Sequence, residues 1–130
     1  MIPYQELRIG NCVLAGNKRQ QVAMIDPRSS KAALNATDGT ASSQEYGFDA
    51  ILPVALTDEV LTECGFSYHD HFKFWKLIEG LDANRSEMDI DTEYNIIDFM
   101  RKPVVKKLGS LHQLQNIYFL LKGKELKLTQ

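Results

Sequence analysis

The stretch GSLHQLQNIYFLLKGKEL, residues 109–126, carries the most regular pattern in the chain. Ser110 and Gln113 form a capping box that predicts the start of a helix, and Gly123 is placed to end it. At 100° per residue, five apolar side chains share an arc of about 120°, which is typical of a helix lying on a sheet. These five side chains are Leu111, Leu114, Ile117, Tyr118 and Leu121.

A second apolar surface follows from the same helix. Phe119 and Leu120 fall outside the arc, and His112 and Asn116 lie beside Phe119 on the helical projection. Because these residues do not belong to the face that packs on the sheet, we expect another surface to cover them. The sequence therefore predicts a partner-binding face made of His112, Asn116, Phe119 and Leu120.

The first 55 residues alternate short β-prone runs with turn signals. Tight connections between short strands predict a small curled antiparallel sheet, of the kind found in SH3-like barrels. Pro53 should end the last strand, because proline cannot donate to a strand ladder. We expect the strands near residues 12–15, 20–25, 31–35 and 45–52, with a small polar loop at 36–44.

The middle of the chain changes from helical to strand periodicity. Thr57 is a candidate N-cap and Gly65 a candidate C-terminal cap, which predicts a helix of about two turns. The run FKFWKLIEG then predicts a strand covered on both faces. In EMDIDTEY, strict alternation predicts a half-exposed strand with Met88, Ile90, Thr92 and Tyr94 facing inward.

Together these patterns predict an α+β fold. We expect an all-β lobe at residues 1–55 and an α+β lobe at residues 56–130, joined in one compact unit. In the second lobe, a short helix precedes a β-meander, and the C-terminal amphipathic helix packs on that meander.

The charge distribution provides an alternative to protein binding. The 130 residues carry a net charge of −2, which argues against a general nucleic-acid binder. However, residues 45–100 hold three Lys/Arg and thirteen Asp/Glu, whereas residues 101–130 hold seven and one. The alternative prediction is therefore nucleic-acid binding through a basic C-terminal region. Its candidate residues are Arg101, Lys102, Lys106, Lys107, Lys122 and Lys124.

No catalytic or metal-binding set emerges from residue spacing. His69 and His71 have strand spacing, but two ligands do not make a metal site. Cys12 and Cys64 have no metal-type spacing and are expected to be reduced thiols. We therefore predict no cofactor and no enzyme activity. The chain start lacks signal-peptide features and no apolar run is long enough for a membrane span, so the expected location is the cytoplasm.

Three stretches also resemble a known family: ELRIGNCV, PVALTDEVLTECGF and LHQLQNIYFLLKGKEL. They are similar to LRIGN, PIPLTEEWLLKFGF and HQLQNLYFALTGEEL, which recur in that order in small uncharacterised proteins of Bacteroides-type gut bacteria and their phages and mobile elements. This chain departs at Val60, where the family often has an aromatic residue. It also departs at Lys122 and Lys124, where Thr and Glu are usual. The resemblance implies a phage or mobile-element setting and supplies no catalytic residues.

These observations favour a non-enzymatic protein-binding or accessory module. An unknown protein is one candidate partner. A second copy of the chain is the simplest one, because a symmetric homodimer needs a single patch. Nucleic acid is the alternative partner.

Overall fold

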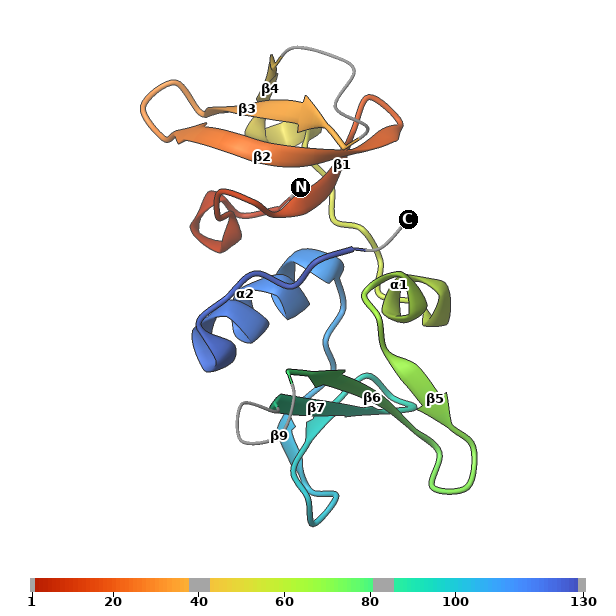
Figure 1. The fold of residues 1–130 in the computed structure, drawn as a ribbon. Coiled ribbons are helices and arrows are strands. Elements are labelled where there is room, and N and C mark those ends of the chain that lie inside the picture. The colour runs from red at the N-terminus through yellow and green to blue at the C-terminus, as the bar shows by residue number, and fades with distance from the viewer. Residues whose placement is uncertain (1, 38–42, 81–85, 129–130) are drawn as a thin grey trace. The chain divides into compact units, whose positions relative to one another are not determined.

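The computed structural model describes residues 2–37, 43–80 and 86–128, and it shows an α+β fold with two antiparallel sheets (Figure 1). The chain forms two compact units, Met1–Ala55 with Ser110–Glu125, and Leu56–Gly109 with Leu126–Gln130. Most of the loop expected at 36–44 lies outside the described residues. None of the helices among the described residues has the length and apolar character to span a membrane.

The first unit contains a four-stranded sheet in sequence order. The three predicted N-terminal strands are confirmed. Asn17 adopts a positive φ of 62° in the turn after the first strand, a conformation that asparagine tolerates well. The elements are η1 (Tyr4–Glu6), β1 (Cys12–Ala15), β2 (Lys18–Asp26), β3 (Lys31–Ala36), β4 (Gln44–Gly47) and η2 (Phe48–Ala50). Val13, Val22, Leu34 and Ile51 are fully buried members of its core.

The strand expected at 45–52 is shorter than predicted. It ends at Gly47 because the chain then turns into η2, where the backbone N–H of Phe48 donates to the carbonyl of Ser30 at 3.0 Å. After η2, Leu52 and Leu14 exchange two backbone hydrogen bonds of 2.8 Å as an isolated bridge. The named strands form an open sheet, so the structure shows the α+β class and does not show a closed barrel.

Helix α2 (Leu111–Lys122) belongs to the first unit, whereas the sequence placed it on the meander of the second lobe. Helix α2 lies in the first unit because its polar side chains form hydrogen bonds with the N-terminal segment. Leu111, Leu114 and Tyr118 are buried as predicted. Leu121 was wrongly assigned to the core, since 57% of its surface is exposed.

The two ends of α2 match the prediction differently. Gly123 adopts a φ of 73° and donates its N–H to the carbonyl of Phe119 at 2.9 Å, so the predicted helix end is confirmed. The capping box is wrong. The side chain of Ser110 makes no cap hydrogen bond, because its hydroxyl lies 3.0 Å from Nδ1 of His112.

The second unit contains a short helix and a five-stranded meander in sequence order. The predicted N-cap is confirmed, since the Thr57 hydroxyl accepts the N–H of Val60 at 3.2 Å. The sequence did not predict the first and last strands, which have three residues each. The elements are α1 (Asp58–Glu63), β5 (Ser67–His69), β6 (Phe74–Glu79), β7 (Ser86–Asp91), β8 (Ile96–Ile97) and β9 (Pro103–Val105).

The prediction that this strand is covered on both faces is confirmed only in part. Trp75 and Leu77 are buried on one face of β6, whereas on the other face Phe74 is buried and Ile78 is exposed. Phe72, the first residue of the predicted strand, precedes β6 and is exposed.

The alternation predicted for residues 87–94 holds only within β7, where Met88 and Ile90 are buried. Thr92 and Tyr94 lie beyond the end of the strand. Tyr94 has a φ of 61° in a turn, so its side chain leaves the strand pattern.

Candidate functional site

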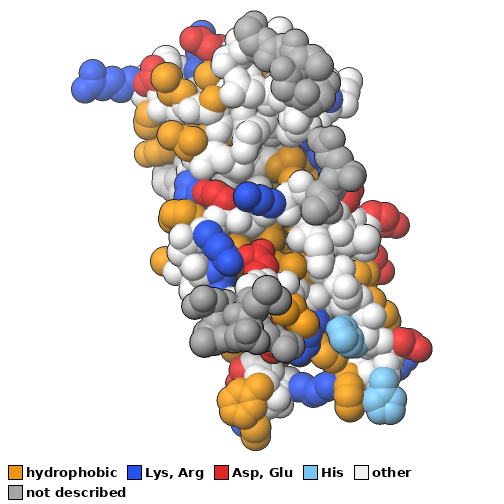
Figure 2. Space-filling model, in the orientation of Figure 1, with side chains coloured by type: hydrophobic (Ala, Val, Ile, Leu, Met, Phe, Trp, Pro, Cys, Tyr) orange, Lys and Arg blue, Asp and Glu red, His pale blue; other side chains and the backbone are white. Residues whose placement is uncertain are grey.

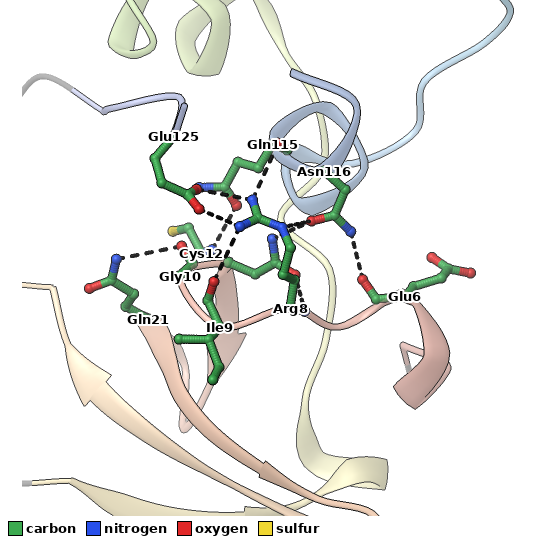
Figure 3. A network of polar contacts seen from close by, with 10 residues as sticks. Glu6, Arg8, Ile9, Gly10, Cys12, Gln21, Gln115, Asn116 and Glu125 are labelled. Carbon is green, nitrogen blue, oxygen red and sulfur yellow. Dashed lines mark hydrogen bonds and ion pairs between the residues drawn. The ribbon is translucent and has the colours of Figure 1, made fainter. Parts of the chain in front are cut away.

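Arg8 is the centre of a polar network that joins the N-terminal segment to α2 and the residues after it (Figure 3). Its Nε donates to Oδ1 of Asn116 at 3.1 Å, and one terminal nitrogen donates to the carbonyl of Gln115 at 3.4 Å. The guanidinium also forms a two-point ion pair with the carboxylate of Glu125. A planar donor with five N–H groups suits this arrangement, which lysine could not reproduce.

Asn11 and Asn116 continue the network into the interior. Asn11 is fully buried; its Oδ1 accepts the N–H of Arg8 at 2.7 Å, and its Nδ2 donates to Oδ1 of Asn116 at 2.8 Å. The Nδ2 of Asn116 donates to the carbonyl of Glu6 at 2.7 Å. Both amides are therefore used for packing the unit.

The side chain of Gln115, the residue before Asn116, also links α2 to the N-terminal part of the unit. Its Oε1 accepts the backbone N–H of Cys12, the first residue of β1, at 2.8 Å. Both residues are buried. The stretches LRIGN and HQLQN, which carried the family resemblance, thus meet in space, and their polar side chains hold α2 against the N-terminal segment (Figure 3).

His112 was a predicted partner-binding residue, and the structure places it inside the unit instead. It is buried, and its Nε2 lies 2.9 Å from a carboxylate oxygen of Glu6. Since a carboxylate accepts, Nε2 donates there, and in the neutral ring Nδ1 accepts the Ser110 hydroxyl. Asn116, also predicted to bind a partner, is likewise taken up by the polar network.

The contacts of Ser110, His112 and Glu6 have the order of a catalytic triad, but not the accessibility of one. Ser110 is only 4% exposed. The adjacent N–H of Leu111, a natural oxyanion donor, is already bonded to the carbonyl of Val54 at 2.8 Å. A substrate carbonyl therefore has little access to the Ser110 hydroxyl, and the N–H of Leu111 is not free to bind it. These contacts fix the start of the helix.

Phe119 and Leu120, the other two predicted partner-binding residues, are exposed together with Leu121. Leu120 is 81% exposed, the largest value among these three. Arg8 covers one side of Phe119, with its Cζ 4.4 Å from the ring centroid. We call Phe119, Leu120 and Leu121 the apolar edge of α2.

The predicted basic residues are divided between the two units. Arg101, Lys102, Lys106 and Lys107 belong to the second unit, and Lys122 and Lys124 belong to the first. Positive and negative side chains are interspersed on the face drawn in Figure 2.

Arg101 is engaged by its own unit. Its Cζ lies 4.3 Å from the ring centroid of Phe72, and it donates to the carbonyl of that residue at 3.0 Å. The adjoining pocket of about 310 Å³ is also lined by Glu87, Asp89 and Asp98. Burial raises the pKa of Asp89 despite the opposing charge of Lys76. The three carboxyl groups outnumber the two basic side chains of the described lining, Lys76 and Arg101, and this balance disfavours phosphate.

A second pocket, of about 400 Å³, was not predicted from the sequence. Aromatic side chains from β5, β6 and the turn after β7 line it together with an acid from α1. The sequence did not predict strand β5, and it placed Tyr94 in a strand, so no sequence pattern indicated that these elements converge. The lining residues are Asp58, Tyr68, Trp75, Thr92 and Tyr94.

His69 and His71 take part in ring contacts. His69 stacks on Phe74 with centroids 5.1 Å apart, and His71 meets the edge of Phe72 at 4.5 Å. Among the described residues, no group of three or more His, Cys, Asp and Glu side chains is arranged to hold a metal ion.

No match was found for this chain among protein-family models, curated proteins or solved structures. The function is therefore inferred from the geometry of the two units.

Proposed function

We propose that the protein is a non-enzymatic interaction module and that the apolar edge of α2 is its contact surface. The observation that carries the proposal is the exposure of Leu120 and Leu121 on a helix whose other side is fixed by buried polar contacts. A rigid helix bearing exposed aliphatic side chains binds at a low cost in conformational entropy.

A second copy of the chain is the proposed partner. Two copies of the apolar edge related by a two-fold axis bury six side chains, which contribute roughly 9 kcal/mol from their partly exposed state. Association costs about 4–15 kcal/mol in lost freedom of motion. We therefore expect a weak dimer whose population depends on protein concentration.

Sedimentation velocity over a range of concentrations tests this proposal. We expect the wild-type sedimentation coefficient to rise with concentration and Leu120→Lys to sediment as a monomer throughout. Met24→Lys is the matched control, because it places the same charge at another exposed apolar position of the first unit. A wild type that stays monomeric at all concentrations would contradict self-association.

Nucleic-acid binding through the basic residues is the alternative proposal. Its support is the exposure of Lys102, Lys106 and Lys107 around β9. The acids lining the Arg101 pocket weaken it, because they repel phosphate.

We further propose an SH3-like character for the N-terminal sheet. In support, the chain makes a 3-10 turn at η2 and then pairs Leu52 with Leu14 of β1, as a barrel of this type requires at its closing edge. The setting we propose, an accessory protein of a phage or mobile element acting in the cytoplasm, rests on the family resemblance.

A further inference from the structure

The aromatic pocket of the second unit has two walls that meet at an angle. Tyr68 of β5 and Trp75 of β6 are directly paired residues, so their side chains share one face of the sheet. Their ring centroids lie 5.1 Å apart and their planes are inclined by 56°. Two adjacent rings at this inclination form a corner.

Tyr94 contributes the third aromatic wall. Its φ of 61° is uncommon for a residue with a large side chain, and such conformations are kept only where the surroundings enforce them. Here its N–H donates to the carbonyl of Asp91 at 3.1 Å, and its carbonyl accepts the N–H of Leu108 at 2.9 Å. The backbone thus holds the ring at the pocket.

An acid completes the lining. The hydroxyl of Tyr94 donates to Oδ1 of Asp58 at 2.8 Å. Burial, with smaller contributions from this hydrogen bond and from the charges of Asp58 and Glu59, raises the pKa of Tyr94 to about 12. The phenol therefore keeps its proton at neutral pH, and the pocket combines neutral aromatic rings with a carboxylate.

We propose that this pocket binds a methylated ammonium group, with Tyr68, Trp75 and Tyr94 as its aromatic walls and Asp58 as its counter-charge. Ring faces attract cations, and a methylated cation loses little hydration when it enters an aromatic corner. The lining residues that the structure describes include no Lys or Arg, so a cation meets no like charge from them. This proposal is independent of the apolar edge of α2, which lies in the other unit.

Other ligand classes fit the pocket less well. An anion would face the Asp58 carboxylate, and no positive side chain among the described lining residues offsets that charge. A metal ion would find one carboxylate, that of Asp58, among the described lining residues, whereas protein sites for such ions use several ligands. A neutral apolar ligand fits the rings alone, and the experiment below separates this case from a cation.

Trp75 is the single tryptophan of the chain, so its fluorescence reports on the pocket without labelling. We expect choline chloride, titrated into the full chain, to give a saturable change. Its uncharged carbon analogue 3,3-dimethylbutan-1-ol should bind at least about tenfold more weakly. Equal binding of the two, or a response to choline no different from that to sodium chloride at the same ionic strength, would overturn the proposal.

Three variants assign the effect to the pocket. Tyr68→Ala removes a half-exposed wall and should weaken choline binding about tenfold. Asp58→Asn keeps an oxygen that can accept from Tyr94 and removes the charge, so a loss of about fivefold is expected. Phe99→Ala, at an exposed aromatic residue of the same unit, is the control and should bind like the wild type.

The source of the cation is decided by a further comparison. Choline represents a free small molecule, and Nε-trimethyllysine amide represents a modified protein side chain. The ligand that binds more tightly, choline or Nε-trimethyllysine amide, identifies the source of the cation. Either result supports the proposal that the pocket binds a methylated ammonium group, provided that unmethylated lysine amide binds more weakly. Circular dichroism of each variant identifies unfolding. If one pocket variant unfolds, the other provides the test, and unchanged binding in a folded pocket variant would contradict the proposal.

Discussion

The guanidinium of Arg8 lies over the ring of Phe119, with its Cζ 4.4 Å from the ring centroid. The same group is bonded to Asn116 and paired with Glu125. One side chain therefore connects the polar network to the apolar edge of α2. A change at Arg8 should affect both the stability of the first unit and the exposed surface of the helix.

Arg8→Lys should lower the free energy of unfolding by about 2 kcal/mol, because a single ammonium cannot contact Asn116, Gln115 and Glu125 together. Urea denaturation followed by circular dichroism measures the change. Arg28→Lys is the control, since Arg28 is exposed and its hydrogen bond to Asp26 uses only the backbone N–H. Equal stability of the two variants would show that the network contributes little.

Asn11→Ala should lower the free energy of unfolding by more than the small number of removed atoms indicates. The substitution removes the acceptor for the Arg8 N–H and the donor to Asn116 in a fully buried position. Unsatisfied buried groups cost about 1–3 kcal/mol each, so we expect a loss of roughly 3 kcal/mol in urea denaturation. Gln21→Ala, on the exposed surface of β2, should change the midpoint little.

Asp89→Asn should stabilise the protein at neutral pH. Burial raises the pKa of Asp89 above its ordinary value of 3.8, so the folded state disfavours the ionised form. The folding advantage of the protonated acid is fully present below pH 3.8 and is lost as pH rises through the folded-state pKa.

The advantage of the Asp89→Asn variant over the wild type should therefore be largest at neutral pH and shrink on acidification. Urea midpoints measured at several pH values between neutral and the ordinary pKa give this profile. Glu45→Gln, at an exposed acid, is the control. A difference that stays constant across this range would mean that ionisation of Asp89 carries no folding penalty.

Replacing Lys106 and Lys107 by Glu tests the nucleic-acid alternative. If these side chains contact phosphate, gel shifts at low salt should show wild-type binding that weakens steeply with salt, and the double variant should bind far less. Lys18→Glu with Lys31→Glu reproduces the charge change in the other unit. No retardation of DNA or RNA by the wild type at low salt would remove this alternative.

Local patterns predicted the elements better than they predicted the contacts between elements. The caps at Thr57 and Gly123 and the first three strands depend on neighbours in sequence, and the structure confirms them. The position of α2 depends on hydrogen bonds between residues more than 100 positions apart. No periodicity encodes such a pairing, so the helix was assigned to the wrong lobe.

The candidate sites show the same difference between local patterns and contacts between distant segments. Phe119 and Leu120 were predicted from helical periodicity alone, and both are exposed. His112 shares their region of the helix but is buried, because Glu6 and Ser110 supply partners that the helical projection does not contain. The aromatic pocket needs residues from four separate parts of the second unit, which a reading of single stretches cannot bring together.

The first unit is built from two segments that are far apart in the chain, Met1–Ala55 and Ser110–Glu125, and this separation affects the order of folding. During synthesis, Met1–Ala55 leave the ribosome long before Ser110–Glu125 can supply their half of the polar network. Residues Leu56–Gly109 are contiguous, so they can reach their native topology before α2 has been synthesised and has packed on the sheet of the first unit. Leu56–Gly109 should thus become protected from hydrogen exchange before the amino-terminal sheet, although this segment is synthesised later. The amino-terminal sheet should become fully protected only after translation has passed Glu125.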